Sequence, residues 1–331
     1  MKRKVGNQAK GKRLKANVGS RPRQATTISL RPLRLHQARV VITVLFAVLF
    51  AGIVGRTQGG TSRKQTDSRP LRVAVVGFVG ASSGAYAEAA RAALAKDGRA
   101  VLIDPSQMQP ALKGVGYQNS LNLSRKEAQD IGAAIGCDFF ILGKADSARR
   151  SESANETHEE ATIGVLIVDS RSGALAHFDF VLERGASAAA AENKAAQTLA
   201  AHADHYVETM IACRAARAVV APAGEPVDEM PDTESAMAAG FKAPEFLNRV
   251  KPEYTDEASR ADVTATVEAN VIFKATGAVG EIEIVRWAGF GLDESAVRAI
   301  RQLSFKPATR NGKAINVRAL VRYNFRRLNE R

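Results

Sequence analysis

Three glycines near the start of the folded sequence have a setting that could serve phosphate chemistry. Gly77, Gly80 and Gly84 follow an apolar run typical of a strand and precede a helical pattern. Asp104 ends the next apolar run. The spacing is G-x-x-G-x-x-x-G, whereas a dinucleotide-binding loop needs G-x-G-x-x-G, and no Gly-Lys-Ser/Thr is present for a phosphate loop. We expect a strand-to-helix connection here, with a nucleotide-using enzyme as the alternative.

Histidines are the nearest approach to a metal site. His202 and His205 lie three residues apart on an Ala-rich helical stretch, but a metal centre needs a third ligand, and no H-E-x-x-H motif or cysteine cluster supplies one. His158 stands beside Glu159 and Glu160 in a polar stretch that we expect to be a loop. No nucleophile, base and orienting acid come together in the sequence. We therefore expect solvated histidines, no metal, no cofactor and no enzyme.

The positive charge of the chain is concentrated at its N-terminus. The formal net charge is +13, and residues 1–39 hold twelve of the 47 Lys and Arg and no acid. The other 35 bases face 34 acids. The folded part is therefore nearly neutral, and the tail is better explained by membrane topology than by nucleic-acid binding.

An uncharged segment follows this tail. Residues 40–55 read VVITVLFAVLFAGIVG and can span a bilayer at the short end of the usual range, with arginines snorkelling on both sides. Basic residues before the segment outnumber those after it, so the positive-inside rule places the N-terminus in the cytoplasm. We expect a single-pass protein of the inner membrane with its bulk in the periplasm. A cleaved signal peptide is the alternative, because small residues near Ala51 suit a peptidase.

Two cysteines, Cys137 and Cys213, would lie in an oxidising compartment with this topology. A structural disulfide and a pair of separate thiols both remain open.

The composition divides the chain into six segments. A spacer rich in Gly, Ser and Thr and a linker with Pro222, Pro226 and Pro231 separate the regions with regular hydrophobic patterns. The predicted segments are a basic tail at 1–39, an anchor at 40–55, a spacer at 56–69, an α+β domain at 70–214, a Pro/acid-rich linker at 215–243 and a last domain at 244–331.

The middle domain mixes strand and helix patterns. An apolar strand at 71–78, a helix ended by Gly98 and a second strand ended by Pro105 form a β-α-β start. Ser124 and Glu127 form a capping box before the next helix. A third strand at 137–147, a hairpin that turns at 169–173 and an Ala-rich helix at 186–212 complete the domain. The predicted fold class is α+β.

The last domain has the order β-β-α-β. A strand alternates from Val263 to Phe273, and a turn at 275–277 leads into the next strand. A helix runs from Asp293, its predicted N-cap, to Leu303. We expect Trp287 and Phe305 to be at least partly buried under this helix. The final strand, 314–325, alternates apolar and polar residues and nearly ends the chain.

Several short motifs in one order give this last domain a family resemblance. The residues that carry the likeness are Pro252, Tyr254, Gly277, Gly291, Leu292, Asp293, Phe305, Pro307 and Gly312. With these motifs the domain resembles the C-terminal domain of the TonB energy-transducer family. Thr255 and Ala314 depart from the family pattern, which usually has proline at these two positions.

The resemblance implies a function in the cell envelope. TonB-like proteins are driven by an ExbB/ExbD-type proton channel and bind the box peptide of an outer-membrane TonB-dependent receptor at an edge strand. Such pairing would explain an uncovered final strand. A scaffold without proton-driven work is the alternative, because Thr43 is the only polar residue where the family's anchor often has His and Ser. The expected partner-binding residues are Ile315, Asn316, Val317, Arg318, Ala319, Leu320, Val321 and Arg322.

The middle domain resembles the TolB N-terminal and CsgG-like periplasmic domains. The likeness rests on the Ser124-Arg-Lys-Glu-Ala128 start, on Gly136-Cys-Asp138 and Gly143-Lys144 around a strand, and on Gly173 in the hairpin. It implies contacts with envelope proteins rather than a reaction. A spacer domain that only extends reach is the alternative.

Overall fold

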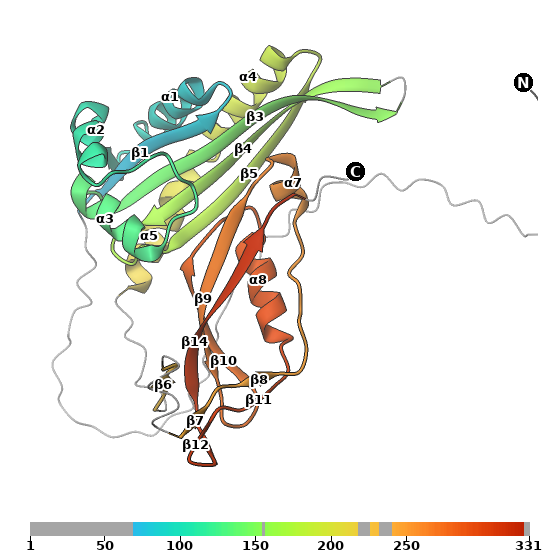
Figure 1. Ribbon diagram of the computed structural model, residues 1–331. Coiled ribbons are helices and arrows are strands. Elements are labelled where there is room, and N and C mark those ends of the chain that lie inside the picture. The colour runs from blue at the N-terminus through green and yellow to red at the C-terminus, as the bar shows by residue number, and fades with distance from the viewer. Residues whose placement is uncertain (1–68, 154–155, 218–225, 232–239, 328–331) are drawn as a thin grey trace, which may run out of the picture. The chain divides into compact units, whose positions relative to one another are not determined.

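The computed structural model describes residues 69–153, 156–217, 226–231 and 240–327. All of them belong to one compact unit, Arg63–Arg331. They form a mixed α+β fold with two main sheets (Figure 1). The predicted anchor and basic tail lie outside the described residues. Among the residues described, no helix has both the length and the apolar character to cross a membrane.

The first sheet has five strands in the order β2-β1-β3-β4-β5. β1 is parallel to β2 and β3, whereas β3, β4 and β5 run antiparallel. This is the predicted β-α-β start followed by a hairpin. The strands are β1 (Leu71–Gly80), β2 (Ala100–Leu102), β3 (Phe139–Ser153), β4 (Glu156–Asp169) and β5 (Leu175–Gly185).

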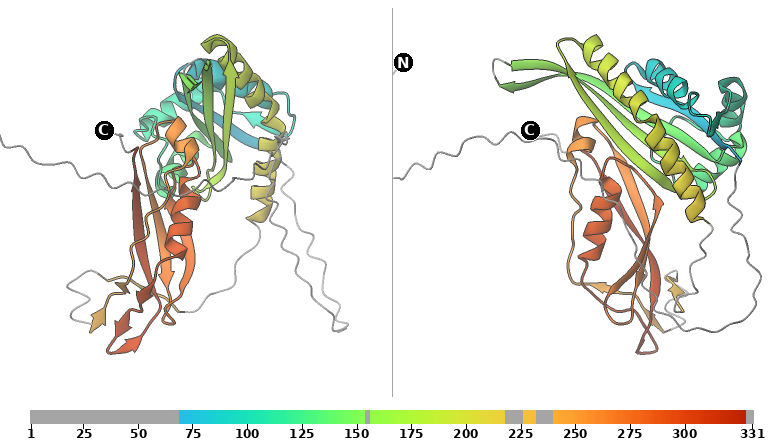
Figure 2. Two further views of the ribbon diagram at one scale, coloured as in Figure 1. Left: turned by 90° about the vertical axis from the view of Figure 1, so that its right-hand side faces the viewer. Right: turned by 180° about the vertical axis from the view of Figure 1, so that it is seen from behind.

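Five helices accompany this sheet. α1, α4 and α5 cover one face, as Figure 2 shows from behind, and their buried side chains join one core cluster with β1, β3 and β4. α2 and α3 contribute to a second cluster on the opposite face. The helices are α1 (Ser83–Leu94), α2 (Pro105–Gly114), α3 (Arg125–Ile135), α4 (Ala188–Ala201) and α5 (Ala203–Ala216).

Some elements of the first sheet differ from the prediction. The segment with His158, Glu159 and Glu160 is not a loop but the start of β4, because it pairs with the far end of β3. The Ala-rich helix is interrupted at His202. α2 was not predicted: Pro105 is its first residue, and the Asp104 side chain accepts from the Ser106 N–H at 2.7 Å.

The second sheet has four strands in the order β10-β9-β14-β6, with α8 against one face (Figure 1). The order β9, β10, α8, β14 is the predicted β-β-α-β arrangement. The main elements are β6 (Asp228–Glu229), β9 (Ala265–Phe273), β10 (Val279–Arg286), α8 (Leu292–Arg301) and β14 (Val317–Phe325). Shorter elements are β7 (Phe241–Lys242), β8 (Glu245–Phe246), α7 (Asp256–Arg260), β11 (Phe305–Lys306), β12 (Thr309–Arg310) and β13 (Lys313–Ala314).

The start of α8 corrects the predicted N-cap. The N-cap is Gly291, with φ 70, and Asp293 lies in the first turn of the helix. Its carboxylate accepts instead from the backbone N–H groups of Ala288 at 3.0 Å and Gly289 at 2.7 Å. Asp293 therefore fixes the loop before the helix. Burial raises the pKa of Asp293 to about 7, although the two N–H groups favour the carboxylate.

The final strand is shorter than predicted. Ala314 belongs to β13, where it pairs with Thr309. The Ile315 N–H donates to Ala308 O at 3.0 Å, and the Asn316 side chain accepts from the Ala275 N–H at 2.9 Å. These contacts interrupt the pairing before β14 begins, so the strand starts at Val317.

The two sheets share a hydrophobic core that the sequence did not predict. Trp287 is 1% exposed, and its indole Nε1 donates to Gly173 O in the β4–β5 turn at 3.0 Å. The ring of Phe290 lies 4.9 Å from that of Phe178 on β5. A Cβ at Gly164 would meet the Phe290 ring at 2.5 Å, so only glycine allows this approach. Trp287 is therefore buried against the first sheet as well as near α8.

Candidate interaction surface

The outer edge of β14 is the candidate surface. β14 pairs with β9 along its whole length, from Val317 opposite Phe273 to Phe325 opposite Ala265. On its other side it pairs with β6 only at Val317 and Arg318. Beyond Arg318, no strand in the described part of the chain continues this pairing. The edge therefore offers main-chain donors and acceptors from residue 319 onward.

The register shows which residues present their main chain to this edge. The carbonyl oxygens of Asn316 and Arg318 accept from β6 and the residue after it. Backbone groups alternate along a strand, so Leu320 and Arg322 also direct their N–H and C=O groups outward. The side chain of Leu320 is 52% exposed, whereas Val317 and Phe325 are buried. Among the residues described, Leu320 thus combines a main chain without a strand partner on this side with an exposed apolar side chain.

An apolar groove lies beside this edge. It encloses about 1070 Å³ between the segment 243–251 and β14. Phe246 is 47% exposed, and its ring lies 5.3 Å from that of Phe273 and 6.3 Å from that of Phe305. The apolar lining includes Met230, Phe246, Val250, Ala319, Leu320, Val321 and Tyr323. An edge with a groove beside it can hold both the backbone and alternate side chains of an extended peptide.

The charges around the groove are mostly basic. Arg249, Lys251 and Arg318 line it, with Glu229 of β6 as the acid. Arg318 pairs with Glu229 at 2.6 Å. Arg322 is held by Glu268 on β9 at 2.5 Å, so its charge is already partly neutralised. Arg318 is paired with the short strand β6 rather than with the neighbouring strand β9, so it is the arginine that a peptide replacing β6 on this edge would meet.

The family-motif residues lie mainly in turns and packing contacts rather than on this edge. The Tyr254 hydroxyl donates to Val263 O at 2.7 Å and also lies 3.1 Å from Ala258 O, which joins α7 to the residues before β9. Leu292 and Phe305 are buried, whereas Pro252 and Pro307 are half-buried. Glycines with positive φ form the turns: Gly277 at φ 83, Gly291 at φ 70 and Gly312 at φ 80. The motif thus shapes the domain.

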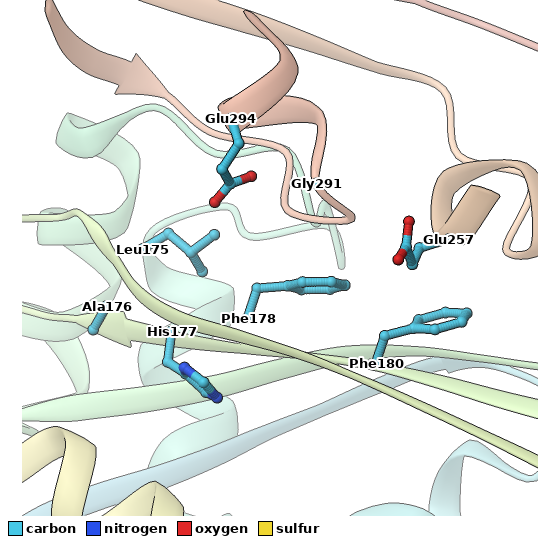
Figure 3. Close-up of a pocket in the computed structure, with 8 residues that line it drawn as sticks. All are labelled: Leu175, Ala176, His177, Phe178, Phe180, Glu257, Gly291 and Glu294. Atoms are coloured by element: carbon cyan, nitrogen blue, oxygen red, sulfur yellow. The ribbon is translucent and has the colours of Figure 1, made fainter. Parts of the chain in front are cut away.

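A smaller cavity lies between β5 and the starts of α7 and α8 (Figure 3). It has a volume of about 380 Å³. The rings of Phe178 and Phe180 line it together with the carboxylates of Glu257 and Glu294. Aromatic rings and carboxylates complement a cation rather than a phosphate, so this cavity gives no support to nucleotide binding.

The glycines and histidines singled out in the sequence take part in packing and hydrogen bonds of the fold. Gly77 and Gly80 lie inside β1, and a Cβ at Gly80 would meet Ala145 O at 2.0 Å. Gly80 is thus required by strand packing. His202 is half-buried, with its Nδ1 2.7 Å from a carboxylate oxygen of Asp179, whereas His205 is exposed as expected. Within the described ranges, no group of three His, Cys, Asp or Glu could hold a metal ion.

Cys137 and Cys213 are separate thiols in the structure. Burial raises the pKa of the Cys137 thiol to about 11, which disfavours the reactive thiolate.

The sequence of the C-terminal part defines its class. Residues 250–326 match the family described as Gram-negative bacterial TonB protein C-terminal. This part of the chain is a TonB-type C-terminal domain, as its motifs predicted. No curated protein matches the chain.

Solved structures resemble parts of the chain. The TonB C-terminal domain of Pseudomonas aeruginosa is 17% identical, with a TM-score of 0.24, and the match covers 32% of this chain and 99% of that one. The LpoB C-terminal domain from Salmonella enterica is 18% identical, with a TM-score of 0.26, covering 35% and 83%. The hypothetical protein CT253 from Chlamydia trachomatis is 11% identical, with a TM-score of 0.32, covering 44% and 99%.

Sequence reasoning missed two parts of the candidate surface. The groove wall at 243–251 has no regular period, so its position beside β14 could not be read from the pattern. The pairing of β6 was also missed, although Pro226 and Pro231 bound a short extended stretch and give a weak signal.

Proposed function

We propose that this chain is a TonB-like protein of the cell envelope that binds an extended peptide of an outer-membrane receptor at the β14 edge. Residues 40–55 would anchor it in the inner membrane with the N-terminus in the cytoplasm. An ExbB/ExbD-type channel would then supply the energy for transport. The activity is binding, with no cofactor and no reaction.

The observation that carries the proposal is the edge of β14 from residue 319 onward. In the described part of the chain, this edge offers main-chain groups without a strand partner beside an apolar groove with a basic rim. An exposed edge of this kind promotes aggregation unless a partner is meant to use it. Strand addition explains the edge and the groove together.

A second function, that of a static envelope adaptor, is favoured by the shared core. Trp287 and Phe290 pack the TonB-type domain against the first sheet. A domain fixed in this way suits a scaffold that holds two partners at a set distance. Collapse of the proton gradient separates the two functions: receptor-dependent uptake would stop for a transducer, whereas receptor binding by a scaffold would continue unchanged.

The binding test uses Leu320, whose N–H points to the open edge. Leu320→Pro removes that donor without removing a bond to β9, and Leu320→Ala removes only the side chain. The full chain in detergent micelles would be titrated with synthetic peptides from receptor N-termini. We expect Leu320→Pro to weaken binding about tenfold or more and Leu320→Ala about threefold or less. Equal binding by wild type and a folded Leu320→Pro variant, checked by circular dichroism, would place recognition on another surface.

Topology is tested separately. A reporter that is active only outside the cytoplasm, fused after Thr61, should be active while the full-length chain stays in the membrane fraction. Recovery of a soluble chain that begins after about Ala51 would instead identify the segment as a cleaved signal peptide.

A further inference from the structure

A short segment of the chain itself lies on one end of the candidate edge. β6 runs parallel to β14, with Asp228 opposite Val317 and Glu229 opposite Arg318. The Asp228 N–H donates to Asn316 O at 3.0 Å, and the Met230 N–H donates to Arg318 O at 2.9 Å. β6 thus pairs with the strand in the way proposed for a partner peptide.

Side-chain contacts of β6 and Met230 add to this main-chain pairing. Asp228 forms an ion pair with Arg310 at 3.1 Å, and Glu229 forms one with Arg318 at 2.6 Å. Met230, two residues beyond Asp228, contributes to the lining of the apolar groove and is 37% exposed. The segment therefore places acids on basic side chains and an apolar residue at the groove.

The attachment of β6 is weak enough to be reversible. The strand has two residues, and its ion pairs are partly exposed, which limits their strength. The covalent link favours pairing of β6 with β14, because a tethered strand has an effective concentration of the order of millimolar. A partner peptide with better contacts can displace it.

We propose that residues 226–231 are a built-in competitor that occupies one end of the peptide site and must leave before a partner pairs along the whole of β14. This inference rests on the proposed function. It also states the chemistry of the partner: an extended peptide, parallel to β14, with an acid at Arg318 followed by an apolar residue for the groove.

The variants follow from the hydrogen-bond pattern. Asp228→Pro with Met230→Pro removes both N–H donors to β14. Val227→Pro is the matched control, because parallel pairing uses alternate residues and the Val227 N–H points away from β14. Glu229→Lys is a second way to release the segment, since it places two positive charges together at Arg318 and changes no backbone group.

The probe is a labelled peptide of the sequence PVDEMP, titrated into the full chain in detergent micelles. If β6 is paired with β14 about nine-tenths of the time, its release should strengthen peptide binding about tenfold. We expect this gain for the double proline variant, a smaller gain for Glu229→Lys, and none for Val227→Pro. Equal affinity of wild type and both released variants would overturn the inference.

Receptor peptides then separate this inference from the proposed function. Receptor peptides that bind wild type and released variants equally well would leave the function standing and refute the competitor. Released variants that bind PVDEMP more tightly but no receptor peptide would support the competitor and refute the receptor as partner.

Discussion

β5 and β14 are both edge strands, but the chain treats them differently. On β5, Asp179 accepts from the Tyr206 hydroxyl at 2.5 Å, Glu183 accepts from Thr198 at 2.8 Å, and the Lys194 ammonium donates to Arg184 O at 2.9 Å. These contacts bind the strand to α4 and α5. β14 instead has a two-residue strand over one end and an apolar groove along the rest.

The difference concerns what each edge is for. A helix packed along an edge strand is one of the ways in which proteins protect that edge from pairing with another strand. On the opposite face of β5, Phe178 packs on Phe290 beside the small cavity of Figure 3. We therefore interpret β5 as an edge strand that serves the fold alone, and β14 as one whose outer edge is accessible to a partner strand. The predictions below test this contrast, from the largest expected effect to the smallest.

Trp287→Ala should have the largest effect on stability, because the indole belongs to the core shared with the first sheet. We expect the free energy of unfolding to fall by about 5 kcal/mol, measured by urea denaturation. Trp287→Phe, which keeps an aromatic ring but loses the hydrogen bond to Gly173 O, should cost about 1–3 kcal/mol. An unchanged midpoint for Trp287→Ala would show that the two sheets are stable independently of this contact.

Phe305→Ala tests the aromatic packing beneath the groove that lies next to β14. Phe305 is 6% exposed and its ring lies 4.9 Å from that of Phe273. We expect a loss of about 3–4 kcal/mol in thermal or urea unfolding. Phe246→Ala is the matched control: its side chain is half exposed, so it should cost about 1 kcal/mol while still weakening peptide binding. A stable Phe305→Ala variant would mean that α8 packs in another way.

His177 on β5 should give a smaller, pH-dependent effect. Burial lowers the pKa of His177 below 6.5, although Asp179 opposes this. The unfolded chain then binds more protons than the folded chain as pH falls through 6.5, so stability is complete above pH 6.5 and declines below it. Measured from pH 7.5 to 5, His177→Phe should lose less stability than wild type as pH falls. Identical slopes would assign the dependence to another group.

The same pH range leaves Asp179 ionised. Burial opposes its charge, but hydrogen bonds from Tyr206 and His202 keep the pKa of Asp179 below its usual range. Its contribution is present above about pH 4 and is lost only as pH falls further. Asp293, whose pKa burial raises to about 7, acts in the opposite direction and favours the folded chain as pH falls, so the part due to His177 is the difference between wild type and His177→Phe.

The elements that follow from local pattern were predictable. The alternation from Ala265 to Phe273, the turn at Gly277 and the apolar stripe of α8 each lie within a few residues of sequence. Ser124 and Glu127 form the predicted capping box. Periodicity and turn chemistry determine such elements almost independently of the rest of the chain.

The parts that were missed depend on contacts between distant residues. Phe178 and Phe290 meet across more than a hundred residues, and so do the Trp287 indole and Gly173 O. His202 was expected in solvent because its partner, Asp179, lies on another element. The residues of β14 were identified from alternation, but the pairing of β6 depends on where the linker returns, which no local pattern specifies.

Hydrogen exchange of the two edge strands tests the central claim most directly. The full chain would be exchanged with and without a receptor peptide, and protection compared between the fragments that contain Val317–Phe325 and Leu175–Gly185. The account predicts that the peptide slows exchange in the β14 fragment, whose outward amides at Leu320 and Arg322 become paired, and leaves the β5 fragment unchanged. Protection of β5 alone, or bound peptide with no protection of β14, would contradict it.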